Sequence, residues 1–397
     1  MEKKILFIET GNHGGGSFGS LSQTISTLDR KRFHPIVFYL NPTPHVERMR
    51  RLGVKVYLIR DLLYNNTTPE VLKRALVGLN WFLGSRIPRL LPLYEWLIHA
   101  YPLLRLRSIV RREGVDLIHL NNTMVRHFFC VVGLRGLGVP IVSHLRSFII
   151  KGANPYMAKY TNQNVIKYIA YSEGVKDYWA AVGVDKGNVD IIPNGIGAVQ
   201  VAPLDVWKHI DIPRRKGPLI GCVGAVKVNR TYDYMLRSFV HILKQEPEAF
   251  LLIVGKWMDR GLCEKLQRMA RDLGIADSVR FHGPDSEATR IISGLDALSI
   301  PYRIEPFGRV LLEAWALGIP VIATRVGRID QIISHMQDGI LVNHGDEHAM
   351  TSAVLTLFRD RTLRSAMAER GRKTVQERFS IQSCTRQLES LYDGLLS

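Results

Sequence analysis

The chain of 397 residues has few cysteines and no local metal-binding pattern. Its four cysteines, at positions 130, 222, 263 and 384, form no C-x-x-C pair, and no cysteine–histidine cluster has the spacing of a zinc site. This content is typical of reduced thiols in a reducing compartment and excludes a disulfide-stapled scaffold.

Long apolar runs and acidic side chains are also scarce. No run reaches the roughly 20 apolar residues that a membrane-spanning helix needs, and the N-terminal MEKKILFIET enters a strand-like run without the apolar region of a signal peptide. We therefore expect a cytoplasmic protein. Asp and Glu number 36 against 53 Lys and Arg, a net charge of +17. Residues 1–200 hold 26 basic and 13 acidic side chains, so we expect an anionic partner there, such as a phosphate, a nucleic acid or a membrane surface.

Short apolar runs alternate with helical patterns in two series. The first series comprises 5–8, 35–40, 54–59, 116–120, 141–144 and 165–171, and the second 219–224, 250–254, 279–282, 297–301, 321–323 and 339–342. Apolar strands separated by helices are typical of parallel sheets covered on both faces. A proline-rich, basic stretch near 195–217 separates the series. We predict an α/β protein of two Rossmann-like domains facing across a cleft, with ligands at the carboxyl ends of the strands.

A glycine-rich loop follows the first strand. Gly14, Gly16 and Gly19 form G-x-G-x-x-G before a helical pattern, where glycines let the backbone approach a phosphate. The second strand ends at Tyr39-Leu40-Asn41, without the carboxylate that holds a dinucleotide's ribose. The sequence leaves two interpretations of this loop open: a phosphate-binding loop, or a tight turn that binds no ligand.

Ionisable residues follow two further strands. His144 ends the 141–144 run, where it either meets a substrate or is a buried, satisfied side chain. Lys227 and Arg230 follow the 219–224 run, where they either neutralise a diphosphate or belong to a solvated basic loop.

The stretch 304–324, IEPFGRVLLEAWALGIPVIAT, is the most informative. We expect Glu305 at the sugar end of a ligand, Glu313 on ribose hydroxyls, and the amides of a helix opened by Gly308 on the phosphates. The alternative is a capping Glu305 and a surface Glu313, although the apolar residues after Glu313 favour a partner for its carboxylate. No D-x-D occurs in the chain. We therefore expect no metal and no cofactor, and we assign the leaving-group charge to basic side chains and helix N-termini.

With these motifs, the sequence resembles the family 4 glycosyltransferases over nearly its whole length. The most specific part is Glu305–Ala314, in which seven residues separate two glutamates, extended by Ala316–Thr324 and Gly327. The supporting pieces are Gly14–Gly16, Val115–His119, His144, Tyr171–Glu173, Ile192–Gly195, Leu252–Gly255 and Asp338–Val342. The resemblance implies the GT-B fold, a nucleoside diphosphate sugar as donor and transfer with retention of anomeric configuration.

The resemblance also implies a division of roles. Residues 1–198, with a returning helix at 380–397, would form the acceptor-side domain, and residues 199–379 would bind the donor. By family pattern, His144 and Glu305 are the catalytic residues at the donor sugar, and Glu313 contacts the ribose. The remaining donor-binding residues implied are Gly15, Gly16, Lys227, Arg230, Phe307, Gly308, Arg309 and Val310. One departure is Ala225, which stands where the family usually has an arginine, with Arg230 at the family's lysine position.

Residues 71–112 combine eight basic side chains with many aromatic and aliphatic ones and a single acid, Glu95. This mixture favours an interfacial segment on an anionic membrane. We predict that one membrane or acceptor surface contains Arg86, Arg89, Trp96, Arg105 and Arg107. The alternative is an ordinary helical insertion with a solvated basic face. On the membrane hypothesis, the protein is peripheral on the inner face of the cytoplasmic membrane and takes a glycan or lipid-linked acceptor.

These interpretations predict a retaining, metal-independent glycosyltransferase of envelope polysaccharide or glycolipid synthesis. Two alternatives from other classes stay open. Ala225 suggests a sugar-nucleotide-binding subunit without activity, and the charge suggests a nucleic-acid-binding protein. The charge comes with no recognised nucleic-acid motif, so we expect no nucleic-acid partner.

Overall fold

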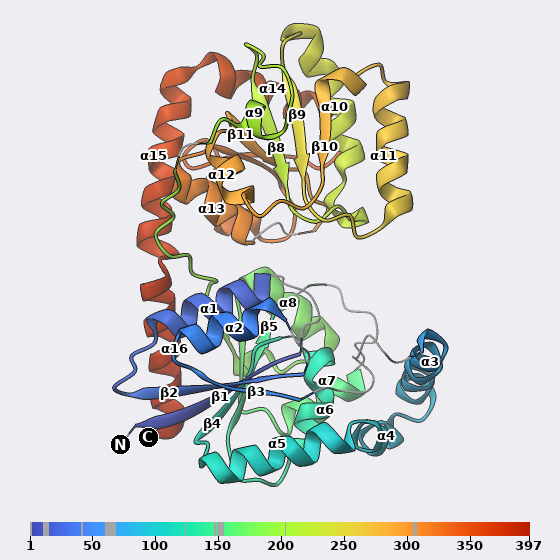
Figure 1. Ribbon diagram of the computed structural model, residues 1–397, viewed down its shortest axis with the longest axis vertical. Helices are drawn as coiled ribbons and strands as arrows, with labels where there is room; N and C mark the ends of the chain where they lie inside the picture. Colours follow the sequence, from blue (N-terminus) through green and yellow to red (C-terminus); the bar gives the residue numbers. More distant parts are fainter. Residues whose placement is uncertain are drawn as a thin grey trace. The chain divides into compact units, whose positions relative to one another are not determined.

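The computed structural model describes residues 2–10, 16–40, 43–59, 69–122, 124–146, 148, 155–202, 204–304 and 308–397. The chain forms two compact units, Met1–Gly195 with Ile381–Ser397, and Ile196–Ser380 (Figure 1). The structure thus places the boundary at 195/196 and the return of the chain at 380/381. The sequence placed them at 198/199 and 379/380.

The first unit is built on a seven-stranded parallel sheet of order β3-β2-β1-β4-β5-β6-β7. The strands are β1 Lys3–Glu9, β2 Phe33–Tyr39, β3 Lys55–Leu58, β4 Leu117–Leu120, β5 Ile141–Leu145, β6 Lys167–Ala170 and β7 Val189–Ile191. The sequence identified all of these except β7, a three-residue edge strand that is too short to give a periodic signal. The inner strands β1, β2, β4, β5 and β6 are largely buried on both faces, as expected for a parallel sheet between helices, whereas the edge strands β3 and β7 are partly exposed.

Helices cover both faces of this sheet. They are α1 Gly16–Thr27, α2 Pro44–Arg51, α3 Glu70–Arg86, α4 Leu91–Ile98, α5 Ala100–Glu113, α6 Met124–Leu134, α7 Pro155–Asn162, α8 Glu173–Val182 and α16 Ile381–Leu396, with 3-10 turns η1 Pro88–Leu90 and η2 Lys186–Asn188. No helix of the described part of the chain is long and apolar enough to span a membrane.

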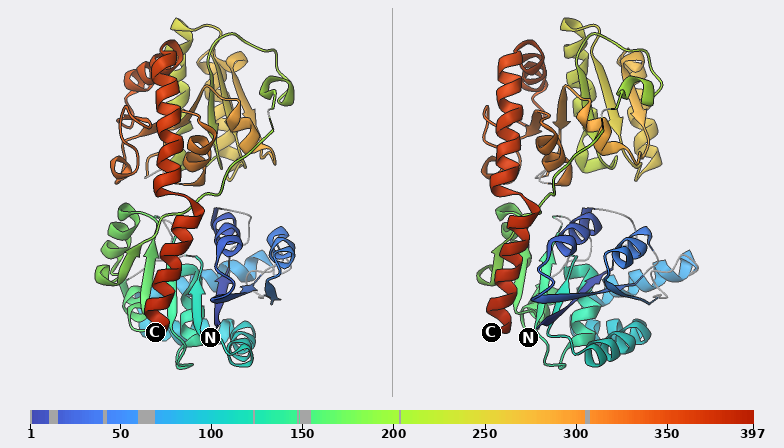
Figure 2. Two further views of the ribbon diagram at one scale, coloured as in Figure 1. Left: turned by 90° about the vertical axis from the view of Figure 1, so that its left-hand side faces the viewer. Right: turned by 60° about the vertical axis from the view of Figure 1, so that its left-hand side comes forward.

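The last helix, α16, packs on the first unit although it follows the second unit in sequence (Figure 2). Its buried positions recur every three to four residues, which is the pattern of one helix face against a core. Leu388 and Tyr392 join the cluster of Ile5, Phe7 and other strand residues. Glu389 accepts the backbone N–H of Asp29 at 2.7 Å. These contacts make α16 an integral layer of the first unit.

The second unit has a six-stranded parallel sheet of order β10-β9-β8-β11-β12-β13. The strands are β8 Leu219–Val223, β9 Phe250–Val254, β10 Val279–His282, β11 Ala297–Ile300, β12 Val321–Thr324 and β13 Ile340–Val342. The sequence predicted all six. The flanking elements are α9 Val206–His209, η3 Val228–Arg230, α10 Tyr232–Gln245, α11 Arg260–Asp272, η4 Ala276–Ser278, α12 Ala288–Ser293, α13 Arg309–Leu317, η5 Ile329–Gln331, α14 Glu347–Arg359 and α15 Arg361–Arg378. Two parallel sheets, each flanked by helices, confirm the expected two-domain α/β architecture.

Candidate functional site

In the first unit, His144 lies at the carboxyl end of β5 beside His119, which lies near the end of β4. The two histidines are buried, and His119 Nε2 lies 2.8 Å from His144 Nδ1. The other nitrogen of His119, Nδ1, is bonded to the Tyr392 hydroxyl of α16. A chain of three buried side chains therefore runs from the returning helix to the sheet edge where α/β proteins bind ligands.

Arg146 fixes the direction of this hydrogen-bond chain. Its Nη2 lies 3.2 Å from His144 Nδ1, and a guanidinium donates but never accepts. His144 Nδ1 is therefore an acceptor, which also receives the Nε2–H of His119. It follows that His119 Nδ1 accepts the Tyr392 O–H, and that neutral His144 carries its proton on Nε2. This Nε2–H has no hydrogen-bond partner among the described residues and is a donor for a ligand.

Burial keeps both histidines neutral. It lowers the pKa of His144 and His119 well below the ordinary value of 6.5, and the nearby Arg146 lowers it further. The Arg146 guanidinium is itself surrounded by buried groups, and burial lowers its pKa to about 10, opposed by Glu9 and two tyrosines. At neutral pH the cluster therefore contains one cation and two uncharged imidazoles.

Glu9 and two asparagines complete the network. The buried Glu9 carboxylate ends β1 and accepts the side-chain amides of Asn121 at 2.7 Å and Asn122 at 3.1 Å. Arg146 donates to the Asn121 carbonyl oxygens and, at 2.7 Å, to Asn194 Oδ1. The register brings these groups together, because Ile8 pairs with Leu120 and Asn121 N–H bonds Ile8 O.

In the second unit, basic residues gather where β8 and its neighbour β11 end. Lys227 precedes η3 and Arg230 closes it, and Arg303 N–H bonds Asn229 O, which joins the loop after β8 to the loop after β11. The Arg230 guanidinium stacks on the Tyr302 ring, 4.2 Å from its centroid. Burial lowers the pKa of Arg230 and, together with Arg230 itself, that of Lys227.

The Arg230 guanidinium is incompletely paired. Its Nη1 is shut off from solvent and has no hydrogen-bond partner among the described residues. Gly224 makes room for it: a Cβ there would overlap Nη1, and the φ of +133° at Gly224 is one that other residues rarely adopt. An enclosed cation with an unused donor is unfavourable unless an anion completes it, so this loop has the chemistry of an anion site.

The helix α13 begins beside the same sheet edge. Gly308 is its extended N-cap, Arg309 and Val310 begin its first turn, and the Leu311 N–H bonds to Gly308 O at 3.2 Å. Glu313 pairs with Arg309 at 3.1 Å, and its side chain is 18% exposed. Burial raises the pKa of Glu313 and Arg309 opposes that rise. The carboxylate thus has a cationic partner within its own helix, so it is not the plain surface residue of the alternative interpretation.

Three of the proposed site residues, Gly15, Glu305 and Phe307, lie outside the described residues. Gly16 is described only through its backbone, as the first residue of α1. Ala225, at the family's arginine position, lies between Gly224 and Val226 in the loop after β8.

The basic segment of the sequence forms α3, η1, α4 and α5. Its only acid, Glu95, is buried and accepts from Asn80 of α3, with His99 Nε2 at 3.5 Å. The Tyr94 hydroxyl donates to Leu76 O at 2.7 Å. Within residues 71–112, the charged side chains described as exposed are therefore all basic; beyond this range, α3 begins at Glu70 and α5 ends at Glu113, whose carboxylate pairs with Lys55 at 2.8 Å.

The exposed surface of α3, η1, α4 and α5 contains most of the exposed large apolar side chains among the described residues: Val71, Leu72, Leu79, Trp81, Phe82, Ile87, Leu90, Leu93, Trp96, Leu97, Tyr101 and Leu104. Arg86, Arg89 and Arg105 are exposed alongside them. Arg107 differs, because it is half-buried and donates to Gly133 O at 2.6 Å and Arg135 O at 3.1 Å. We therefore reassign Arg107 from the predicted membrane or acceptor surface to a residue that caps the carboxyl end of α6.

Sequence reasoning missed several members of the buried network. It did not assign a role to Glu9, Asn121, Arg146 or Tyr392, and it used His119 only as part of a motif. A signal existed for four of the five, because a polar side chain directly follows or ends an apolar strand run. The sequence contained no such signal for Tyr392, because its position fits the apolar face of an amphipathic helix.

Two Rossmann-like sheets with these polar strand ends define a GT-B fold. The model of "Glycosyl transferases group 1" matches residues 206–374, and that of "Glycosyltransferase Family 4" matches residues 45–198. The chain belongs to this glycosyltransferase family and is a transferase enzyme.

Relatives and solved structures agree with this assignment. The chain is 35% identical over 305 residues to N-acetyl-alpha-D-glucosaminyl L-malate synthase of Bacillus anthracis, covering 74% of this chain and 78% of that protein. It is 27% identical over 200 residues to the lipopolysaccharide core biosynthesis glycosyltransferase LpsE of Rhizobium meliloti, covering 50% of this chain and 56% of LpsE. The structure of Anabaena HepE in complex with UDP and glucose superposes with a TM-score of 0.78 at 17% identity, covering 99% of this chain and 100% of HepE. This last likeness shows the fold.

Proposed function

We propose that the protein is a retaining, metal-independent glycosyltransferase that moves a sugar from a nucleoside diphosphate sugar to an acceptor hydroxyl in envelope polysaccharide or glycolipid synthesis. The observation that carries the proposal is the enclosed, incompletely paired guanidinium of Arg230, in a loop that hydrogen-bonds to the segment between β11 and α13. A diphosphate supplies the anion that this cation lacks, and the N-terminus of a helix such as α13 favours phosphate. Relatives named for lipopolysaccharide core synthesis, and solved structures of HepE with UDP and with UDP-glucose, support the donor and pathway class.

In this mechanism, the leaving diphosphate is stabilised by Arg230, Lys227 and the α13 amides of Gly308, Arg309 and Val310, without a metal. Family pattern places Glu313 on the ribose and Glu305 at the sugar. His144 donates its Nε2–H to a donor-sugar hydroxyl, since its other nitrogen already accepts. The departing phosphate oxygen takes the acceptor's proton on the front face, and precise positioning supplies the rest of the rate.

The test is a thermal-shift panel of UDP, GDP, ADP and CMP, each with and without EDTA, on the wild type and Arg230→Ala. We expect one diphosphate to stabilise the wild type equally with EDTA, and Arg230→Ala to lose that shift. Arg361→Ala, at the exposed start of α15, is the matched control and should keep it. Product NMR of the anomeric proton then tests retention. A shift that EDTA abolishes would contradict metal independence.

A second candidate function, a sugar-nucleotide-binding subunit without activity, is favoured by Ala225. It predicts the same diphosphate stabilisation but no release of nucleotide from any donor sugar. Single-turnover incubation of the stabilising donor class with excess enzyme separates the two. If the enzyme neither transfers the sugar nor slowly hydrolyses the donor, the non-catalytic subunit is favoured.

We also propose that the exposed face of α3–α5 binds an anionic membrane, which presents a lipid-linked acceptor. The charge pattern supports this, because the segment's only acid is buried while Trp81 and Tyr101 are 68% and 61% exposed next to arginines. Apolar insertion and attraction of arginines to anionic lipid act together at such a face. Packing of the face against another protein is the alternative.

Vesicle sedimentation tests the membrane surface. The protein should sediment with phosphatidylglycerol-containing vesicles at low salt but not with pure phosphatidylcholine, and Arg86→Glu/Arg89→Glu should weaken this by at least tenfold. The control, Arg268→Glu/Arg271→Glu, reverses two exposed charges on α11. Equal losses in both double variants would show only non-specific charge attraction and would overturn the assignment.

A further inference from the structure

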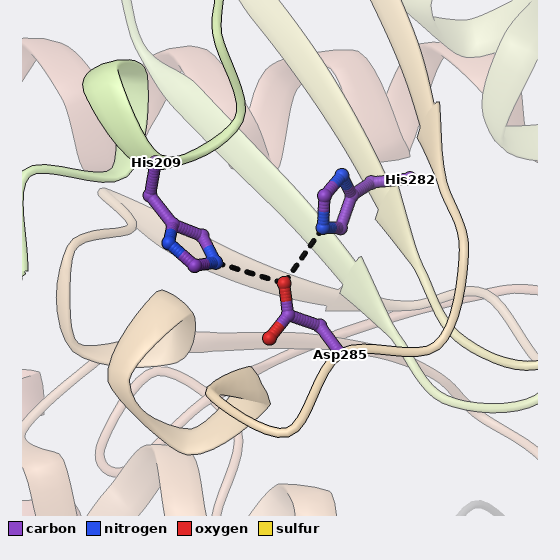
Figure 3. Close-up of side chains that lie close together, drawn as sticks. All are labelled: His209, His282 and Asp285. Atoms are coloured by element: carbon purple, nitrogen blue, oxygen red, sulfur yellow. Dashed lines mark hydrogen bonds and ion pairs between the residues drawn. The ribbon is translucent and has the colours of Figure 1, made fainter.

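Two histidines and one aspartate from separate segments converge in the second unit. His209 ends α9, His282 ends the edge strand β10, and Asp285 follows in the next loop. Asp285 Oδ2 lies 2.8 Å from His209 Nε2 and 2.7 Å from His282 Nε2 (Figure 3). The three ligand atoms all lie within 4.8 Å of one another. Both imidazoles thus turn the same nitrogen toward one carboxylate oxygen.

The cluster has the properties of a metal-binding site. Asp285 Oδ1 accepts the Glu287 N–H at 2.7 Å, which fixes the carboxylate as an outer hydrogen bond fixes a metal ligand. The side chains of His209 and His282 are 28% and 25% exposed, so an ion can enter from solvent. Burial alone would raise the pKa of Asp285, but the Glu287 amide and the two imidazoles hold it at about 2. The carboxylate is therefore ionised at neutral pH.

We propose that His209, His282 and Asp285 bind one zinc ion. Two imidazole nitrogens and one carboxylate oxygen form a ligand set that suits zinc far better than magnesium or calcium, which prefer oxygen. Solvent supplies the fourth ligand of a tetrahedral ion. The proposal does not rest on the donor site, whose cations are Lys227 and Arg230.

Zinc binding requires a proton rearrangement at both histidines. Each Nε2 now donates its hydrogen to Asp285, so its lone pair becomes available only when that proton moves. In a neutral imidazole the proton passes through solvent to Nδ1, and an imidazolium releases one proton to solvent. Zinc binding displaces the Nε2 protons, so zinc affinity should fall as the pH falls.

The ion would join the segment around α9 to the edge of the sheet. That segment is already attached by the buried side chains of Val206, Trp207 and Ile210, with the Trp207 ring 5.5 Å from that of Phe250. Hydrogen bonds add to this packing: Arg280 Nη2 lies 3.4 Å from Ile210 O, and Arg215 donates to Asp277 O at 2.6 Å and Ser278 Oγ at 2.9 Å. Strand β10 pairs only with β9 among the described strands. Zinc would replace two hydrogen bonds with three coordinate bonds across this junction, so it should stabilise the folded protein.

The experiment is calorimetric titration of tag-free, chelator-treated full-length protein with zinc chloride at pH 7.5. We expect one zinc per chain, a raised melting temperature, and at least tenfold weaker binding in each of His209→Gln, His282→Gln and Asp285→Asn. The control is His241→Gln, because His241 belongs to a second histidine pair with Glu347 at 3.7 Å. It should bind zinc as the wild type does.

Cobalt substitution gives a second readout that does not depend on the variants' stability. Wild-type protein loaded with cobalt(II) should show the intense visible absorption of a tetrahedral site, and zinc should displace it. Absence of zinc binding in the wild type would overturn the proposal, as would binding that survives unchanged in the three variants. In that case the cluster is a hydrogen-bonded triad only.

Discussion

Removing the Tyr392 hydroxyl tests whether α16 supports His144 through His119. Tyr392→Phe keeps the ring in the core and deletes only the O–H that His119 Nδ1 accepts. Because Arg146 fixes His144 Nδ1 as an acceptor, His119 cannot reverse its ring protonation to compensate. The substitution therefore leaves a buried imidazole nitrogen without a partner.

The expected cost follows from that unpaired nitrogen. Losing one hydrogen bond and leaving a buried acceptor unsatisfied costs about 1–3 kcal/mol. The chain contains a matched control, Tyr39, which is fully buried in the same core cluster and whose hydroxyl has no partner among the described residues. Tyr39→Phe removes an unsatisfied group, so it should leave the free energy of unfolding unchanged or raise it. Tyr392→Phe should therefore lower the free energy of unfolding, whereas Tyr39→Phe should leave it unchanged or raise it.

Urea denaturation, followed by fluorescence and by far-UV circular dichroism, measures both variants. The transition assigned to the first unit should shift to lower urea in Tyr392→Phe and stay or rise in Tyr39→Phe. In a transfer assay, Tyr392→Phe should lower kcat more than it raises the donor KM, because His144 becomes less well positioned. Equal changes in the free energy of unfolding in both variants would refute the assigned direction of the hydrogen bonds from Tyr392 through His119 to His144.

Three further predictions follow from the structure and sequence. Burial lowers the pKa of His119 and His144 well below 6.5, so both histidines bind protons more readily in the unfolded chain than in the folded unit, and the free energy of unfolding should fall as the pH falls from 6.5 to 5. A pH series of urea melts should show a weaker pH dependence for His119→Gln than for the wild type. Glu305→Ala should lower kcat/KM by about 100-fold, the effect of losing a major electrostatic contact, and initial rates near those of the wild type would remove Glu305 from the site. Arg107→Ala should destabilise the first unit by about 1–3 kcal/mol because it frees two carbonyls, whereas Arg105→Ala should weaken vesicle binding without a change in melting temperature.

Local pattern was enough to predict much of the fold. The apolar run at 250–254 coincides with β9, because a buried parallel strand is apolar on both faces. The run at 279–282 coincides with β10, an edge strand in which only Val279 is buried. Gly318 ends α13, since its φ of +72° lies in the left-handed region that glycine adopts readily at a helix end. The edge strand β7 was missed because three residues, one of them Asp190, carry no periodic signal.

Part of the candidate site was also predictable. His144 ends an apolar run of the first unit, and Lys227 and Arg230 follow one in the second unit; within each unit, a parallel sheet brings its strand ends to one edge. Their partners were not predictable, because the sequence does not state which side chain meets which. Arg107 is an example. The composition of residues 71–112 suggested a surface cation, whereas the packing of α5 on α6 directs the Arg107 side chain to backbone carbonyls.

The sequence by itself determined the family, the two parallel sheets and the residues that end their strands, because those properties depend on local order along the chain. Only the tertiary structure decided that Tyr392 meets His119 across 273 residues, and that His209 shares one carboxylate with His282 and Asp285. Hydrogen bonds and metal ligation require atoms within a few ångströms, and such distances are set by the packing of helices on sheets. Spacing along the chain carries no information about them.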